Sequence, residues 1–130
     1  MKQEDKELLL RDLCARLSYG VICTDSRHGD SRITEIDIVE ETVYCDDFDE
    51  CVEVDRIKPY LRSMSSMTEE EEKEFESLGW RVDELDDNEP WNHNSYNVFD
   101  GIDWLNAHHF DYRGLIKKNL ALEALEGMYK

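Results

Sequence analysis

Four cysteines and four histidines are the residues with the most versatile chemistry in this chain. Zinc sites need closely spaced Cys or His pairs, so that two ligands arrive from one turn of the chain. The nearest grouping comprises Cys23, His28, Cys45 and Cys51, and it contains no CxxC or HxxxH spacing. We therefore expect ordinary thiols, no metal and no cofactor.

Two short segments are rich in carboxylates, residues 46–50 and residues 83–89. Neither has the central glycine and the closing glutamate of a calcium-binding loop. Both are therefore interpreted as solvated turns.

His108 and His109 are adjacent, so on a helix their side chains point about 100° apart and cannot share one ion. We expect one to pack and the other to face water; a chemical role for either is left open. Cys14 falls on an apolar stripe, which predicts a buried and inert thiol. The sequence has no GxSxG, P-loop or GxGxxG motif, so no catalytic residue is assigned.

The elements that would position these residues begin with an amphipathic helix over residues 5–17. Asp5 is the expected cap of its free N–H groups, and Gly20 is suited to a left-handed turn after its end. The stripe at three- and four-residue spacing consists of Leu9, Leu10, Leu13, Cys14 and Leu17.

Residues 32–55 alternate between apolar and polar side chains, which predicts an antiparallel β-meander with a dry face and an acidic face. Turns at 40–41 and 47–50 define the register. The expected cross-strand neighbours are Ile38 with Val43, Ile36 with Cys45, Cys45 with Val52 and Val43 with Val54. In this register Cys45 faces the core and Cys51 faces solvent, so the two form no disulfide.

The second half of the chain is expected to be helical around a long loop. Thr68 and Glu71 form a capping box that opens a helix over residues 69–78. Residues 81–99 show no period, a second helix opens at Asp100, and an apolar tail follows. The prediction is one α+β domain, in which residues 1–62 form the helix and meander, 63–100 an acidic helix and loop, and 101–130 a C-terminal helix and tail.

The formal net charge is −17, and residues 63–100 carry twelve acidic and two basic side chains. A field of this sign repels nucleic acid and anionic membranes and favours a basic protein partner. The acidic segment also holds aromatic side chains that could anchor such a partner. The candidate partner-binding residues are Trp80, Trp91, Tyr96 and Phe99.

Two segments resemble a known group of proteins. They are Lys58-Pro59-Tyr60-Leu61-Arg62-Ser63-Met64-Ser65-Ser66-Met67-Thr68-Glu69-Glu70-Glu71 and Asp103-Trp104-Leu105-Asn106-Ala107-His108-His109-Phe110-Asp111-Tyr112-Arg113-Gly114-Leu115-Ile116, together with Ala121-Leu122-Glu123-Ala124. They are similar to small uncharacterised acidic proteins encoded by gut bacteria and by their phages or mobile elements. The resemblance implies a bacterial or phage cytoplasmic setting and assigns no site residue.

These observations predict a non-enzymatic interaction or regulatory protein that presents an acidic surface to a basic protein partner. One alternative is a small hydrolase or metal-binding enzyme that uses carboxylates and His108 or His109. Another is a DNA mimic that inhibits a nucleic-acid-binding protein. The N-terminus lacks a secretory signal and no apolar run could span a membrane, so we expect a cytoplasmic location.

Overall fold

The computed structural model describes residues 1–78 and 98–129, without the side chains of residues 98 and 99. Its helices are α1 (Gln3–Arg16), α2 (Glu69–Glu76) and α3 (Val98–Ala107), with short 3₁₀ turns at Leu17–Tyr19, Val54–Arg56 and Met64–Ser66. Its strands are β1 (Ile22–Asp25), β2 (Gly29–Asp37), β3 (Thr42–Cys45), β4 (Val52–Glu53), β5 (Ile57–Leu61) and β6 (Leu122–Glu123). The predicted α+β class, with an N-terminal helix and an antiparallel meander, is confirmed.

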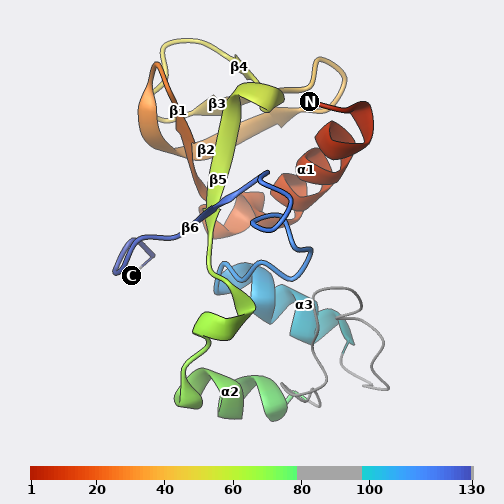
Figure 1. Cartoon of the computed structure of the whole chain (residues 1–130), viewed down its shortest axis with the longest axis vertical. Helices are drawn as coiled ribbons and strands as arrows, with labels where there is room; N and C mark the ends of the chain where they lie inside the picture. Colours follow the sequence, from red (N-terminus) through yellow and green to blue (C-terminus); the bar gives the residue numbers. More distant parts are fainter. Residues whose placement is uncertain (79–97, 130) are drawn as a thin grey trace.

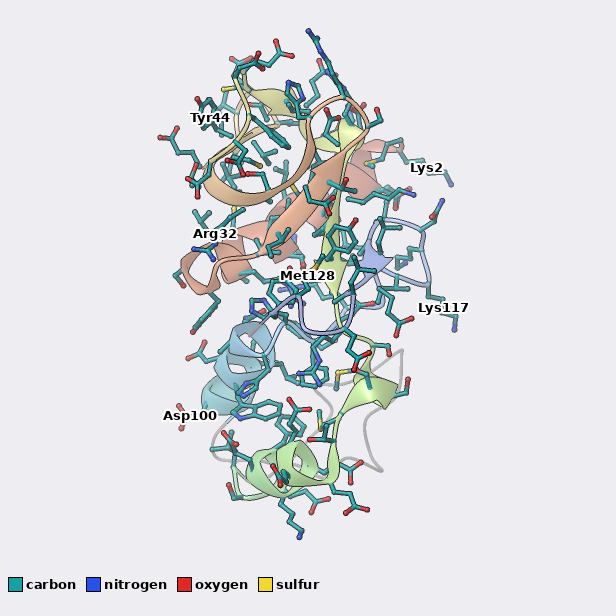
Figure 2. All side chains as sticks on the ribbon, turned by 90° about the vertical axis from the view of Figure 1, so that its left-hand side faces the viewer. Lys2, Arg32, Tyr44, Asp100, Lys117 and Met128 are labelled. Atoms are coloured by element: carbon teal, nitrogen blue, oxygen red, sulfur yellow. The ribbon has the colours of Figure 1, made fainter. Side chains whose placement is uncertain are left out.

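The strands form one mixed sheet in the order β4-β3-β2-β1-β5-β6. Neighbouring strands are antiparallel except β5 and β6, which run parallel. Helix α1 lies beside the sheet, while α2 and α3 lie at the other end of the long axis (Figure 1). From the side, Tyr44 of β3 and Asp100 of α3 lie towards opposite ends of the molecule (Figure 2).

Helix α1 buries its apolar stripe against the sheet through Leu9, Leu10 and Leu13. It begins two residues earlier than predicted, and its N-cap is Lys2, which makes no side-chain cap hydrogen bond. The prediction that Asp5 caps the helix is therefore wrong, although its carboxylate lies in the first turn, where the helix dipole favours negative charge. Gly20 adopts the predicted left-handed conformation, with φ of 77°.

The predicted register of the meander is wrong. Ile36, and not Ile38, lies opposite Val43, and Val43 pairs with Val52 instead of Val54. A two-residue turn at 40–41 would need positive φ at Glu40, and in a type I′ turn at Glu41 as well, which glutamate disfavours. The chain instead turns over residues 38–41, with positive φ at Glu41 alone, and a bulge between Ile33 and Glu35 shifts the pairing.

The predicted orientations of Cys45 and Cys51 hold in spite of the different register. Cys45 is buried and Cys51 is exposed, as predicted, and all four cysteines are free thiols. Cys14 is exposed, so the prediction that it is buried is wrong. The buried face of α1 instead includes Asp12 and Arg16 beside Leu9, Leu10 and Leu13.

Strand β5 was not predicted, because Pro59 in its centre is typical of a break in a sheet. The strand pairs with β1 along residues 57–59, whereas β6 contacts it only at Tyr60 and Leu61. Around Pro59 the strand therefore has one partner, as at a sheet edge, where proline is tolerated. Strands β1 and β2 pair as far as Asp25 and Gly29, so only a short turn joins them.

A second hydrophobic cluster, separate from the one under the sheet, joins α2 to α3 and the segment after it. Its buried members are Met67, Phe75, Trp104, Leu105, Phe110 and Tyr112. The predicted capping box of Thr68 and Glu71 opens α2, and Phe75 is the buried residue of that helix. The side chain of Glu71 also accepts two hydrogen bonds from Arg62, at 2.7 and 2.6 Å, which hold its pKa down at about 2. This ion pair links α2 to the end of β5.

The C-terminal part is less helical than predicted. Helix α3 begins at Val98, two residues before Asp100, and ends at Ala107. The tail consists of turns and the two-residue strand β6. Leu115 and Leu120 cover the core under the sheet, whereas Leu125 is exposed.

Candidate functional site

The predicted partner-binding residues are largely outside the described part of the chain. Trp80, Trp91 and Tyr96 lie outside the described residues. The backbone of Phe99 belongs to α3, but its side chain also lies outside the description. Their role in binding therefore stays a prediction.

A groove lies between α1 and the turn that joins β2 to β3; we name it the α1–hairpin groove. Its volume is about 580 Å³, and it is lined by Gln3, Glu7, Leu10, Arg11, Cys14, Ile38, Val39 and Glu41. A hydrogen bond of 2.9 Å from Gln3 Nε2 to Glu41 Oε2 connects its two walls. The shifted register places Ile38, which was predicted to lie in the core, in the turn beside Val39, where both line the groove.

The apolar side chains at this turn are unusually exposed. Ile38 retains 66% and Val39 retains 88% of its accessible surface. Single exposed aliphatic residues are normal, but neighbouring ones beside an apolar groove are typical of an interaction surface. Sequence reasoning missed it because the alternation of Ile36 and Ile38 predicted two buried residues.

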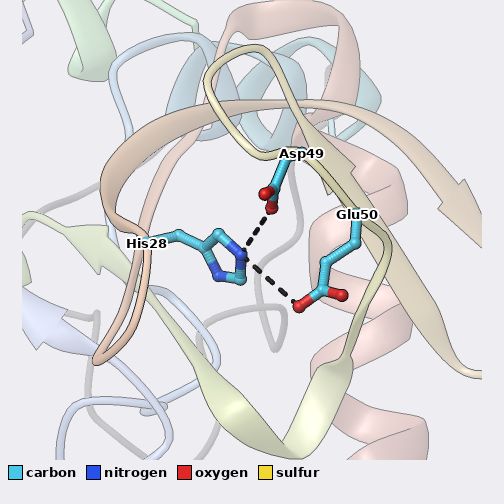
Figure 3. Close-up of side chains that lie close together, drawn as sticks. All are labelled: His28, Asp49 and Glu50. Atoms are coloured by element: carbon cyan, nitrogen blue, oxygen red, sulfur yellow. Dashed lines mark hydrogen bonds and ion pairs between the residues drawn. The ribbon is translucent and has the colours of Figure 1, made fainter.

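A compact cluster of His28 and carboxylates lies at the other end of β2, where β1 turns into it. His28 Nδ1 is 2.7 Å from Asp25 Oδ2, and Nε2 is 3.0 Å from Asp49 Oδ1 and 3.5 Å from Glu50 Oε1. Figure 3 shows the imidazole pointing toward both residues of the loop between β3 and β4. The hydrogen bond with Asp25 raises the pKa of His28; burial opposes the shift, and Asp49 adds to it. The sequence analysis grouped Cys23, His28, Cys45 and Cys51 as the nearest approach to a zinc site. Of these four residues, only His28 belongs to this cluster.

The two core cysteines of that grouping face each other. The sulfur atoms of Cys23 and Cys45 are 3.4 Å apart and fully buried. This contact and burial raise the pKa of the Cys23 thiol far above its usual range. A thiol without access to solvent is inert, so this pair is part of the core.

A buried polar network connects α1 to the segment after α3. Arg16 and Asp12 are both fully buried and form a bidentate ion pair, and Arg16 also donates to the backbone oxygen of Phe110 at 2.7 Å. Arg113 Nε lies 3.2 Å from Asp12. The network holds the two hydrophobic clusters together.

The two adjacent histidines follow α3, which ends at Ala107, so the prediction that they lie on a helix is wrong. One of them is buried and the other is half-buried. His109 has φ of 64°, is 7% exposed, and stacks on Tyr129 with 3.6 Å between ring centroids. His108 stacks on Trp104 at 4.0 Å and is half-buried. Burial, together with Arg16 and other cations, lowers the pKa of His109 to about 4.

The lowered pKa of His109 predicts a specific acid sensitivity. The unfolded chain binds a proton at His109 below its usual pKa of about 6.5 while the folded protein does not, so stability falls as pH drops from about 6.5 to 4. Between pH 7 and 4.5 this contribution is about 2 kcal/mol. We expect His109→Asn, which tolerates the left-handed backbone, to reduce the pH dependence by that amount in denaturation at both pH values. Equal pH dependence of stability in wild type and His109→Asn would contradict the prediction.

Comparisons of the chain with protein-family models, with curated proteins and with solved structures gave no match. The resemblance to small acidic proteins of gut bacteria and their phages therefore stays a prediction. Within the described residues, no helix has the length and apolar character that crossing a membrane requires.

Proposed function

We propose that this protein is a non-enzymatic interaction module that docks a basic segment of another protein in the α1–hairpin groove. The observation that carries the proposal is the exposure of Ile38 and Val39 beside a groove whose rim includes Glu7 and Glu41. An apolar centre with a polar rim is the usual arrangement of a protein interface. The occupant is a segment with aliphatic side chains for the groove and Lys or Arg for the rim.

Charge supports the choice of a basic occupant. Residues 33–55, which include this turn and strands β3 and β4, carry ten acidic side chains and no basic one. Such a field accelerates the approach of a cationic partner and rejects acidic ones, while the aliphatic contacts supply affinity. In the groove itself Arg11 is the cation, and it lies on the α1 side.

The proposal includes a cytoplasmic location, and it is supported by four free thiols, which persist in a reducing compartment. It leaves the predicted role of Trp80, Trp91, Tyr96 and Phe99 intact as a second contact region. Direct nucleic-acid binding is not part of the proposal, because phosphate contacts need clustered Lys and Arg. The bacterial or phage setting is likewise an expectation.

A synthetic amphipathic peptide with Leu on one face and Lys and Arg on the other tests the proposal. We expect binding that weakens as salt is added, because salt screens the acidic field. We expect Val39→Asp to weaken binding by tenfold or more, since it places a charge in the apolar centre. Isothermal titration calorimetry measures both effects.

Leu125→Asp is the matched control, because Leu125 is also an exposed aliphatic residue, at 61% exposure, and lies outside the groove. It should change the affinity by less than about twofold. An equal loss of peptide affinity in Val39→Asp and Leu125→Asp would mean that the added charge, and not its place in the groove, weakens binding. Amide chemical shifts should change in α1 and at residues 36–41; a footprint confined to residues 63–129 would overturn the groove as the docking site.

A further inference from the structure

We infer that His28, Asp49 and Glu50 form a binding site for a divalent transition-metal ion of the zinc class, independent of the proposed docking function. The three side chains each offer one ligand atom, and these atoms lie within 4.8 Å of one another. Imidazole nitrogen with carboxylate oxygen is a donor set that Zn²⁺ accepts and that Ca²⁺, which takes oxygen ligands, does not.

The distances from the imidazole to the two carboxylates fit such an ion. Tetrahedral zinc with bonds of about 2.0–2.1 Å keeps neighbouring ligand atoms about 3.3 Å apart. His28 Nε2 lies 3.0 Å from Asp49 Oδ1 and 3.5 Å from Glu50 Oε1, which brackets that spacing (Figure 3). The two carboxylates are exposed, at 85% and 46%, so they can close on an ion without disturbing the core.

Asp25 prepares the imidazole for this role. Its side chain is fully buried and accepts from the backbone N–H groups of Arg27 and His28, and Arg56 lies 3.3 Å away. Its Oδ2 lies 2.7 Å from His28 Nδ1, which favours a proton on Nδ1. Nε2, which lies 3.0 Å from Asp49 Oδ1, is then the nitrogen that gives up its proton and binds the ion. A buried carboxylate behind a histidine is the usual support of a metal ligand. Its Oδ1 has no hydrogen-bond partner among the described residues, so the side chain is held by its contacts on one oxygen.

The loop that carries Asp49 and Glu50 is also anchored. Phe48 is 3% exposed and packs its ring 4.8 Å from that of His28. The backbone N–H of Asp47 donates to Ser31 Oγ at 2.9 Å. These contacts hold the loop over the imidazole before any ion binds, which is the preorganisation a site requires.

Three protein ligands leave a fourth position for water or for a group of a partner, as in sites that exchange ligands. An ion would also replace the exposed contact of Arg27 with Glu50, which is 3.3 Å long. Binding of the ion therefore includes release of Arg27 from Glu50.

Titration of the purified, metal-free protein with zinc chloride at neutral pH tests the site. We expect one ion per chain and a rise in thermal midpoint with zinc concentration. Asp49→Asn/Glu50→Gln, which changes only exposed side chains, and Asp25→Asn should each weaken zinc binding by tenfold or more. Cobalt titration should give a visible spectrum without a thiolate charge-transfer band, because Cys51 is not a ligand.

Asp46→Asn/Glu53→Gln is the matched control, because it removes the same two charges from exposed residues of the same region. It should retain wild-type affinity within about twofold. Equal weakening by the two double variants, a thiolate band, or no saturable binding would overturn the site. None of these results depends on the docking peptide, so the two proposals fail separately.

Discussion

Replacing Arg16 with methionine is expected to lower the free energy of unfolding by about 3–5 kcal/mol, because it leaves a buried carboxylate without its main partner. The side chains of Arg16 and Asp12 have no exposed surface, and their shortest contact is 2.8 Å. The substitution also removes the donor to the backbone oxygen of Phe110, so the link from α1 to the segment after α3 is lost. Urea denaturation followed by circular dichroism measures the change.

The control for this experiment is Arg11→Met, an exposed position on the same helix, which should change stability by less than about 0.5 kcal/mol. Arg16→Lys should be intermediate, because lysine keeps the charge but cannot make the bidentate contact. Equal stability of Arg16→Met and Arg11→Met would show that Arg113 compensates for the lost guanidinium at Asp12.

Replacing Phe75 with alanine is expected to cost about 3–5 kcal/mol, because a fully buried ring leaves a cavity. Its centroid lies 5.1 Å from that of Trp104, and it is the buried side chain of α2. Two polar contacts also tie that helix to the described part of the chain, namely Trp104 Nε1 to Glu74 at 2.8 Å and the pair of Arg62 with Glu71. We therefore expect α2 to detach while the sheet stays folded.

Hydrogen exchange distinguishes detachment from global unfolding. The amides of α2 should lose protection in Phe75→Ala, whereas those of β1 and β2 should keep it. Glu76→Ala, an exposed change on the same helix, should leave protection and stability within about 0.5 kcal/mol of wild type. Uniform loss of protection across the sheet would mean that the two hydrophobic clusters unfold together.

Features that depend on a few neighbouring residues could be predicted from the sequence. The capping box of Thr68 and Glu71 and the left-handed Gly20 are both observed. Each follows from local hydrogen bonding or backbone freedom, and neither needs knowledge of distant residues. The alternation of apolar residues likewise predicted the antiparallel meander and the inward orientation of Cys45.

The register of that meander required more than alternation. Ile36 and Ile38 have the same parity, so a shift of two residues preserves the pattern and changes only which of them leaves the core. Turn geometry and the bulge after Ile33 set the register of β2 on β3. This register leaves Ile38 and Val39 in the turn that borders the α1–hairpin groove.

The composition and local patterning of the sequence by themselves determined an acidic α+β protein with a helix, a meander and a capped second helix. The tertiary structure alone brought His28 to Asp49, 21 residues later, and Arg16 to Phe110, 94 residues later. Such contacts depend on how strands and helices pack against each other. Residue spacing does not predict them, because the residues meet only when distant segments of the chain are buried against each other during folding. The candidate metal site and the buried ion pair therefore became visible only in the folded chain.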